Sequence, residues 1–205
     1  MKSPEKTMTD ARHAEKMAKK KAARDKILAT KTQEKGLLIV HTGKGKGKST
    51  AAWGMAMRMI GHGRKIGIVQ FVKGAWETGE RDVFDRFPDQ VTIKAMGEGF
   101  TWETQDKARD IAAAEKAWAA AQEMIADPEY SMVILDELNI VLRYDYLDFD
   151  QVLAGLQARR GDLHVVVTGR NAKQDLIEAA DLATEMTLLK HPFRAGIKAQ
   201  AGVEF

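Results

Sequence analysis

The chain has 205 residues and no cysteine, so it can bury one substantial core and it excludes disulfides, thiolate metal sites and a cysteine nucleophile. No apolar stretch approaches the roughly 20 residues that span a bilayer, and the N-terminus is charged where a signal peptide would be apolar. We therefore expect a soluble protein of the cytoplasm with no membrane partner.

The net charge of +3 is unevenly distributed. Residues 1–35 hold 11 Lys or Arg and 5 Asp or Glu, a net +6, which leaves 21 against 24, or −3, for residues 36–205. A basic arm is one mark of nucleic-acid binding. This arm contains no aromatic residue, and its spacing favours a helix with a thin apolar stripe over residues 10–29. We predict a basic helical arm, residues 1–35, that acts as a lid or dimer arm, and no nucleic-acid partner.

A stretch of alternating glycine and lysine, HTGKGKGKST (41–50), follows the first predicted strand at residues 37–40. Glycines let successive backbone N–H groups curl toward an anion, and a helix that starts after the loop adds the positive end of its dipole. Gly47, Lys48 and Ser49 fill the last three places of the P-loop pattern G-x-x-x-x-G-K-[ST]. The alternative is a flexible, solvated turn.

Thr42 stands in the first place of this pattern, where a P-loop usually has glycine. We therefore expect the loop to present phosphates differently from an ordinary ATPase. In a P-loop the lysine contacts the terminal phosphates and the Ser/Thr hydroxyl binds Mg²⁺. The residues predicted to bind ATP are Thr42, Gly43, Lys44, Gly45, Lys46, Gly47, Lys48, Ser49 and Thr50.

Apolar strands and helices alternate along the rest of the chain. Periodicity and turn residues predict helix 51–60, strand 66–72, helix 77–87, strand 91–96 and an Ala-rich helix that starts at Thr104 or Asp106 and ends near residue 127. Strand 132–135, helix 149–159, strand 163–167, helix 173–180 and strand 184–189 follow. The alternation predicts an α/β fold over residues 36–205: a P-loop NTPase-like, largely parallel sheet with helices on both faces.

Polar groups follow several of these strands. Asp136 and Glu137 come after strand 132–135, a Walker-B pattern in which an acid beside the P-loop helix holds Mg²⁺ directly or through its water shell. Arg170 follows the strand at 163–167. Ligands bind beyond the carboxyl ends of parallel strands. We therefore expect Ser49, Asp136 and Glu137 to hold Mg²⁺, or Mn²⁺, at this edge of the sheet.

The use made of ATP stays open at this point. Phe100 and Trp102 lie in a loop with glycines at its start, GEGFTWET (97–104), where they can face a bulky flat ligand or simply belong to the core. An ATPase with Glu137 orienting water, a small-molecule kinase, and a transferase that attacks ATP elsewhere than at phosphorus all fit these residues.

Taken together, the motifs resemble those of the P-loop type ATP:corrinoid adenosyltransferases, the enzymes that make adenosylcobalamin. The matching stretches are TGKGKGKSTAAWG (42–54), VQFVKG (69–74), GEGFTWET (97–104), LDELN (135–139), VVVTGR (165–170) and HPFRAGIKAQAGVEF (191–205). Ordinary P-loop ATPases share only the first and fourth of these. Threonine in the first P-loop place belongs to the resemblance, whereas the N-terminal arm matches less tightly.

The resemblance implies transfer of the 5′-deoxyadenosyl group of ATP to the cobalt(I) of a corrinoid, with release of triphosphate, in adenosylcobalamin biosynthesis or salvage. Cobalt is the nucleophile, so no side chain needs to be one. The resemblance also implies that ATP lies reversed in the loop relative to ordinary P-loop ATPases. Lys48, Lys46 and Arg170 would neutralise the triphosphate, with Mg²⁺ on Ser49 and Glu137 and with Asp136 beside it.

The same resemblance gives the aromatic loop and the arm their roles. Phe100 and Trp102 would fill the lower face of the corrin and displace its axial base, which makes cobalt(II) easier to reduce. The family implies a homodimer whose N-terminal helix closes over the corrin site. The resemblance is also compatible with an electron-donating flavoprotein as a further partner.

Overall fold

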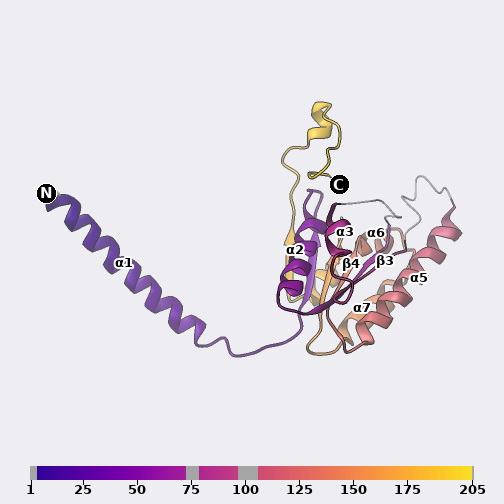
Figure 1. Ribbon diagram of the computed structural model, residues 1–205, viewed down its shortest axis with the longest axis horizontal. Coiled ribbons are helices and arrows are strands. Elements are labelled where there is room, and N and C mark those ends of the chain that lie inside the picture. Colours follow the sequence, from indigo (N-terminus) through magenta and orange to yellow (C-terminus); the bar gives the residue numbers. More distant parts are fainter. Residues whose placement is uncertain (1–3, 73–78, 97–105, 205) are drawn as a thin grey trace. The chain divides into compact units, whose positions relative to one another are not determined.

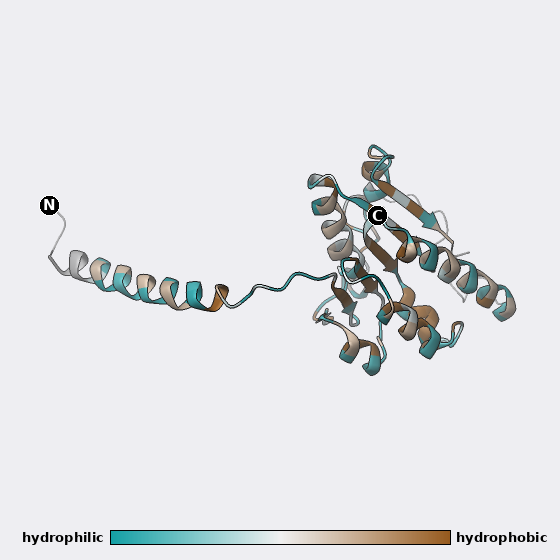
Figure 2. Cartoon of the chain, turned by 90° about the horizontal axis from the view of Figure 1, so that it is seen from below, coloured by the Kyte–Doolittle hydropathy of each residue, from teal (hydrophilic) through white to brown (hydrophobic). Residues whose placement is uncertain are grey.

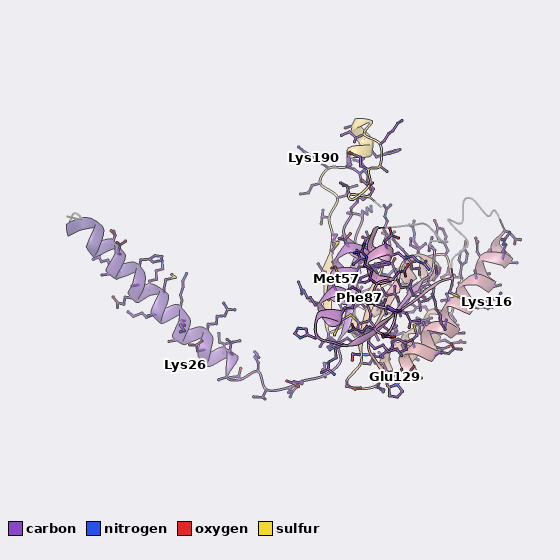
Figure 3. The ribbon with its side chains drawn as sticks, in the orientation of Figure 1. Lys26, Met57, Phe87, Lys116, Glu129 and Lys190 are labelled. Carbon is purple, nitrogen blue, oxygen red and sulfur yellow. The ribbon has the colours of Figure 1, made fainter. Side chains whose placement is uncertain are left out.

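A computed structural model of the chain describes residues 4–72, 79–96 and 106–204 (Figure 1). The chain divides into two units, Met1–Glu34 and Lys35–Phe205. The first unit contains the helix α1 (Pro4–Leu28), which begins earlier than the predicted helix and has the same C-terminal end to within one residue. Residues 9–28 are all exposed, Lys26 among them (Figure 3). No helix in the described part of the chain is both long and apolar enough to cross a membrane.

The second unit is built on a six-stranded sheet with the strand order β3-β2-β4-β5-β1-β6. Every strand pairing in the sheet is parallel, which confirms the predicted α/β fold. The strands are β1 (Leu38–Thr42), β2 (Lys65–Gln70), β3 (Val91–Ala95), β4 (Tyr130–Asp136), β5 (His164–Thr168) and β6 (Leu182–Glu185). Because β5 lies between β1 and β4, its carboxyl end stands between the glycine-rich loop and Asp136.

Helices cover both faces of the sheet (Figure 1). One face carries α2 (Lys48–Gly61) and α3 (Gly79–Phe84). The other carries α5 (Lys107–Ala126), α6 (Leu138–Arg143), α7 (Phe149–Gln157) and α8 (Gln174–Ala179). A short 3-10 helix, η1 (Pro192–Ala195), lies in the C-terminal segment.

Successive residues of each central strand pack into different hydrophobic clusters. In β4, Met132 and Ile134 belong to the cluster with α2, whereas Val133 and Leu135 belong to the cluster with α5. Side chains alternate between the faces of a strand, so a continuous apolar run is what a strand buried on both faces requires. The hydropathy colouring in Figure 2 shows these strongly hydrophobic strands in contrast to the largely hydrophilic α1.

Local sequence signals, such as helix caps, predicted most of the helix and strand boundaries. Asp106 caps α5 by accepting a hydrogen bond from the N–H of Arg109 at 3.1 Å, which bears out one of the two predicted starts. The other, Thr104, lies outside the described residues. Asp148 caps α7 in the same way at 2.9 Å.

One helix was missed and one predicted strand was misplaced. The short helix α6 was missed, because six residues directly after a strand carry too little periodicity to reveal it. The last strand was placed at 184–189, whereas β6 pairs with β1 only from Leu182 to Glu185. The chain then leaves the sheet because Met186 turns toward the glycine-rich loop, where its carbonyl accepts a hydrogen bond from the N–H of Gly45.

Asp181 fixes the start of β1, at the end of the strand opposite to the glycine-rich loop. Its carboxylate accepts hydrogen bonds from the N–H of Leu38 at 2.9 Å and from Arg159 at 3.2 Å, and it pairs with Lys35. The hydrogen bond from Lys35, followed by that from Leu38, lowers the pKa of Asp181 below its ordinary value of 3.8. A carboxyl group whose pKa is lowered by folding stabilises the fold above its unfolded pKa, and this contribution is lost as the pH falls through the folded value.

We predict that Asp181→Asn lowers the free energy of unfolding at pH 7 by about 1 kcal/mol, the scale of a partly exposed charged contact. The difference from the wild type shrinks as the pH falls below about 4, because the carboxylate is protonated there first in the unfolded chain and, at still lower pH, in the folded protein. Urea unfolding followed by circular dichroism at both pH values measures it, with the exposed Asp89→Asn as the control. An equal penalty at pH 7 and at pH 3 would contradict the assigned role of the charge.

Candidate nucleotide-binding site

The glycine-rich loop connects β1 to α2 at the carboxyl edge of the sheet. Gly47 has a φ of 104° and is the N-cap of α2. This left-handed conformation suits glycine, and a residue without a side chain cannot cap the helix itself. The first turn of α2 therefore keeps N–H groups for an anion, at the positive end of the helix dipole.

Gly43 and Gly45 are needed for a reason that the sequence did not reveal. A Cβ atom on Gly43 would lie 2.5 Å from the carbonyl oxygen of Met186, and one on Gly45 would lie 2.7 Å from the same atom. The N–H of Gly45 donates to this carbonyl at 2.6 Å, and the N–H of Met186 donates to the carbonyl of Thr42 at 2.9 Å. The segment after β6 thus lies directly against the loop, and only glycine fits beneath it.

Lys48 is buried, with 6% of its surface exposed, and its Nζ donates to the carbonyl of Gly45 at 2.5 Å. Burial lowers its pKa from 10.5. The negative charge of Glu137 opposes this shift and the positive charge of Arg170 adds to it. Asp136 raises the pKa of Lys48 and Lys46 lowers it, both to a smaller extent. The structure therefore brings four other predicted site residues together around the ammonium group of Lys48, whose charge a polyphosphate would compensate.

Asp136 is the centre of the polar contacts at this edge. It is 1% exposed, and its Oδ1 accepts hydrogen bonds from Ser49 Oγ at 2.7 Å and Thr168 Oγ1 at 2.8 Å. Gln70 Nε2 lies 3.5 Å from Oδ2. The contact between Ser49 and Asp136 joins the first turn of α2 to the end of β4. The roles of Thr168 and Gln70 were not predicted, because the sequence does not show which side chain each one contacts.

A divalent cation fits the donor set of this site. Ser49, Asp136 and Glu137 offer only oxygen atoms, which Mg²⁺ and Mn²⁺ prefer. The described residues contain no group of three or more His, Cys, Asp or Glu able to hold a metal ion by themselves. This agrees with a P-loop site, in which nucleotide phosphates complete the coordination of Mg²⁺.

Glu137 and Asn139 follow Asp136 in a tightly held turn. Glu137 has a φ of 63°, and its N–H donates to Thr168 Oγ1 at 2.9 Å. Asn139 is 1% exposed and donates from Nδ2 to the carbonyl of Gly169 at 3.2 Å. Asn139 was not among the predicted site residues. Its place in the LDELN stretch (135–139), two residues after the Walker-B acids, was the signal that pointed to it.

The remaining predicted residues differ in their burial and contacts. Lys44, Lys46, Thr50 and Arg170 are exposed, and Lys46 forms an ion pair with Glu204 near the end of the chain. Thr42 is buried, and its Oγ1 accepts a hydrogen bond from the N–H of Ala172 at 2.9 Å. Phe100 and Trp102 lie outside the described residues.

The fold and the site define a P-loop nucleotide-binding protein: a glycine-rich loop between a parallel strand and a helix, a buried lysine, and a Ser–Asp contact at the end of a neighbouring strand.

The family model of the ATP:corrinoid adenosyltransferases BtuR/CobO/CobP matches residues 34–205, and that of the cob(I)alamin adenosyltransferase N-terminal region matches residues 5–28. A corrinoid adenosyltransferase of Sinorhizobium sp is 64% identical over 96% of this chain and 92% of its own. That of Pseudomonas aeruginosa is 58% identical over 99% and 98%, and corrinoid adenosyltransferase CobA of Salmonella typhimurium is 43% identical over 97% and 100%. The chain belongs to the ATP:corrinoid adenosyltransferase family, and its activity is the ATP-dependent adenosylation of corrinoids.

We predict that Lys48→Ala lowers turnover by roughly 10²–10³, the scale of losing one preorganised group that stabilises developing charge. The melting temperature without ligand should not fall, because the variant removes an ammonium group that burial disfavours. Steady-state turnover at saturating ATP and thermal unfolding measure the two effects.

Lys116→Ala is the matched control, since Lys116 is an exposed lysine on α5 (Figure 3). Near-normal turnover of Lys48→Ala at saturating ATP would show that this lysine does not contact the reacting nucleotide.

Proposed function

We propose that the enzyme transfers the 5′-deoxyadenosyl group of ATP to the cobalt(I) of a corrinoid and releases triphosphate. The electron pair of cobalt(I) forms the bond to C5′, the C5′–O bond breaks, and its electron pair stays on the departing triphosphate. Cobalt thereby becomes cobalt(III) with an alkyl ligand. The protein contributes position and charge, and it needs no nucleophile of its own.

The observation that carries this proposal is the convergence of cations at the glycine-rich loop. Lys48 is buried there, and the nearby positive charges of Arg170 and Lys46 both lower its pKa further. Mutual repulsion of this kind disfavours the site when it is empty and is relieved when a polyanion binds. Such an arrangement fits a bound polyphosphate, which in this proposal is the triphosphate leaving group. In this proposal Lys48, Lys46 and Arg170 neutralise it, while Thr42–Thr50 form its binding loop.

The same proposal assigns a metal site. Ser49, Asp136 and Glu137 hold Mg²⁺ or Mn²⁺, which when bound neutralises charge on the phosphate oxygens. Support comes from the 2.7 Å contact between Ser49 and Asp136, which already places a hydroxyl and a carboxylate side by side. Burial of Asp136 and its bond to Thr168 keep that carboxylate in one orientation.

The remaining assignments come from the family resemblance. We propose that Phe100 and Trp102 contact the corrin and displace its axial base, and that the arm, residues 1–35, serves as a lid or dimer arm. A homodimer, an electron-donating flavoprotein partner and a cytoplasmic location complete this proposal.

The phosphate product tests the proposed function. With Mg·ATP and a reduced corrinoid, we expect triphosphate and an adenosylated corrinoid in equal amounts, because the bond that breaks is C5′–O. Ion chromatography of the phosphates and absorption spectra of the corrinoid measure the two products. Formation of ADP and phosphate at a comparable rate without corrinoid would instead support an ATPase, and a phosphorylated acceptor would support a small-molecule kinase.

A further inference from the structure

The loop between β5 and α8 carries Arg170 and holds two residues with positive φ. These are Gly169 at 128° and Asn171 at 56°. Glycine adopts such angles freely and asparagine more readily than most residues, but a non-glycine residue stays there only when its surroundings hold it. Arg170 lies between the two, so its direction depends on the contacts that hold the loop.

The first half of this loop is tied to two neighbouring elements. The N–H of Gly169 donates to the carbonyl of His41 at 3.2 Å, which joins it to β1. Its carbonyl accepts from Asn139 at 3.2 Å, which joins it to α6. A Cβ on Gly169 would lie 2.8 Å from that of Asn139, so this end of the loop is closely packed as well.

The second half is tied by Thr42. Its Oγ1 accepts the N–H of Ala172 at 2.9 Å, and the residue is 7% exposed. Thr42 is also the residue that replaces glycine in the first P-loop place. A glycine there would offer no acceptor to Ala172 and would leave this end of the loop without the contact.

We propose that Thr42 is a positioning residue, whose hydroxyl fastens the loop after β5 to the phosphate-binding loop and so holds Arg170 beside the triphosphate. This inference rests on the proposed function, in which Arg170 neutralises that leaving group. It gives a physical reason for threonine at a place where the P-loop pattern has glycine: the hydroxyl accepts a hydrogen bond from the neighbouring loop after β5.

The electrostatics of the site agree with this placement. Burial lowers the pKa of Lys48, and among the positive groups Arg170 adds most to the lowering. The guanidinium therefore lies within electrostatic reach of the lysine of the loop, although Arg170 is itself exposed. An exposed, long side chain has many rotamers, so a fixed backbone beneath it limits the directions that it can take.

The test is a double-variant cycle on the full-length protein with inorganic triphosphate as the probe. Thr42→Val keeps the branched shape and removes the acceptor, and Arg170→Ala removes the cation. Isothermal titration calorimetry gives the triphosphate affinity of the wild type, of each single variant and of the double variant. Steady-state kinetics gives their turnover. Thr42→Ser restores a hydroxyl, and Thr184→Val, an exposed threonine on β6 opposite His41, is the matched control.

We expect Thr42→Val to weaken triphosphate binding about tenfold, the scale of an unmet buried hydrogen bond. Arg170→Ala should weaken it at least as much, and the double variant no further, because Thr42 acts through Arg170. Thr42→Ser should recover most of the loss. If Thr42→Val does not fold, Thr42→Ala takes its place in the cycle.

Wild-type affinity in Thr42→Val, or losses that multiply in the double variant, would overturn the inference. So would an Arg170→Ala variant that binds triphosphate normally, since Thr42 would then have no cation to position. Failure of the proposed function is a separate result, because it would appear in the wild-type enzyme as the absence of triphosphate among the products.

Discussion

The site depends on one buried carboxylate, that of Asp136. Its Oδ1 receives the hydroxyls of Ser49 and Thr168, which joins the start of α2 to the ends of β4 and β5. A buried carboxylate is costly unless hydrogen bonds satisfy it, and these two contacts together offset that cost. The phosphate loop, the Walker-B acids and the loop with Arg170 are thereby held around a common point.

A second constraint is the close approach of the chain after β6. Met186 packs against Gly43 and Gly45, and its carbonyl accepts a hydrogen bond from the N–H of Gly45. The conformation of the loop therefore depends on this neighbouring segment as well as on its own glycines. Lys48, held beneath it, is buried and surrounded by other charges. The protein thus keeps an electrostatically unfavourable group in place before its ligand arrives, which is a common cost of a preorganised binding site.

The sequence predicted the parallel sheet, its helices and most of the residues that meet at its edge, because strand periodicity and motif spacing are local signals. It did not predict that Met186 crosses the loop, that Thr168 bonds both Asp136 and the N–H of Glu137, or that Thr42 faces Ala172. Each of these joins residues 30 or more positions apart, and only the strand order brings them together. Helix α6 was missed for a different reason, since its six residues are too few to show a period.

The central claim is that the phosphate loop holds triphosphate as a leaving group while the C5′–O bond of ATP breaks. The most direct measurement uses ATP with oxygen-18 at the oxygen that joins C5′ to the α-phosphorus, turned over with a reduced corrinoid. Mass spectrometry should find the label in triphosphate, because cleavage at carbon leaves the bridging oxygen with the phosphates. Label retained on the nucleoside product would mean that a P–O bond had broken, and it would contradict the account.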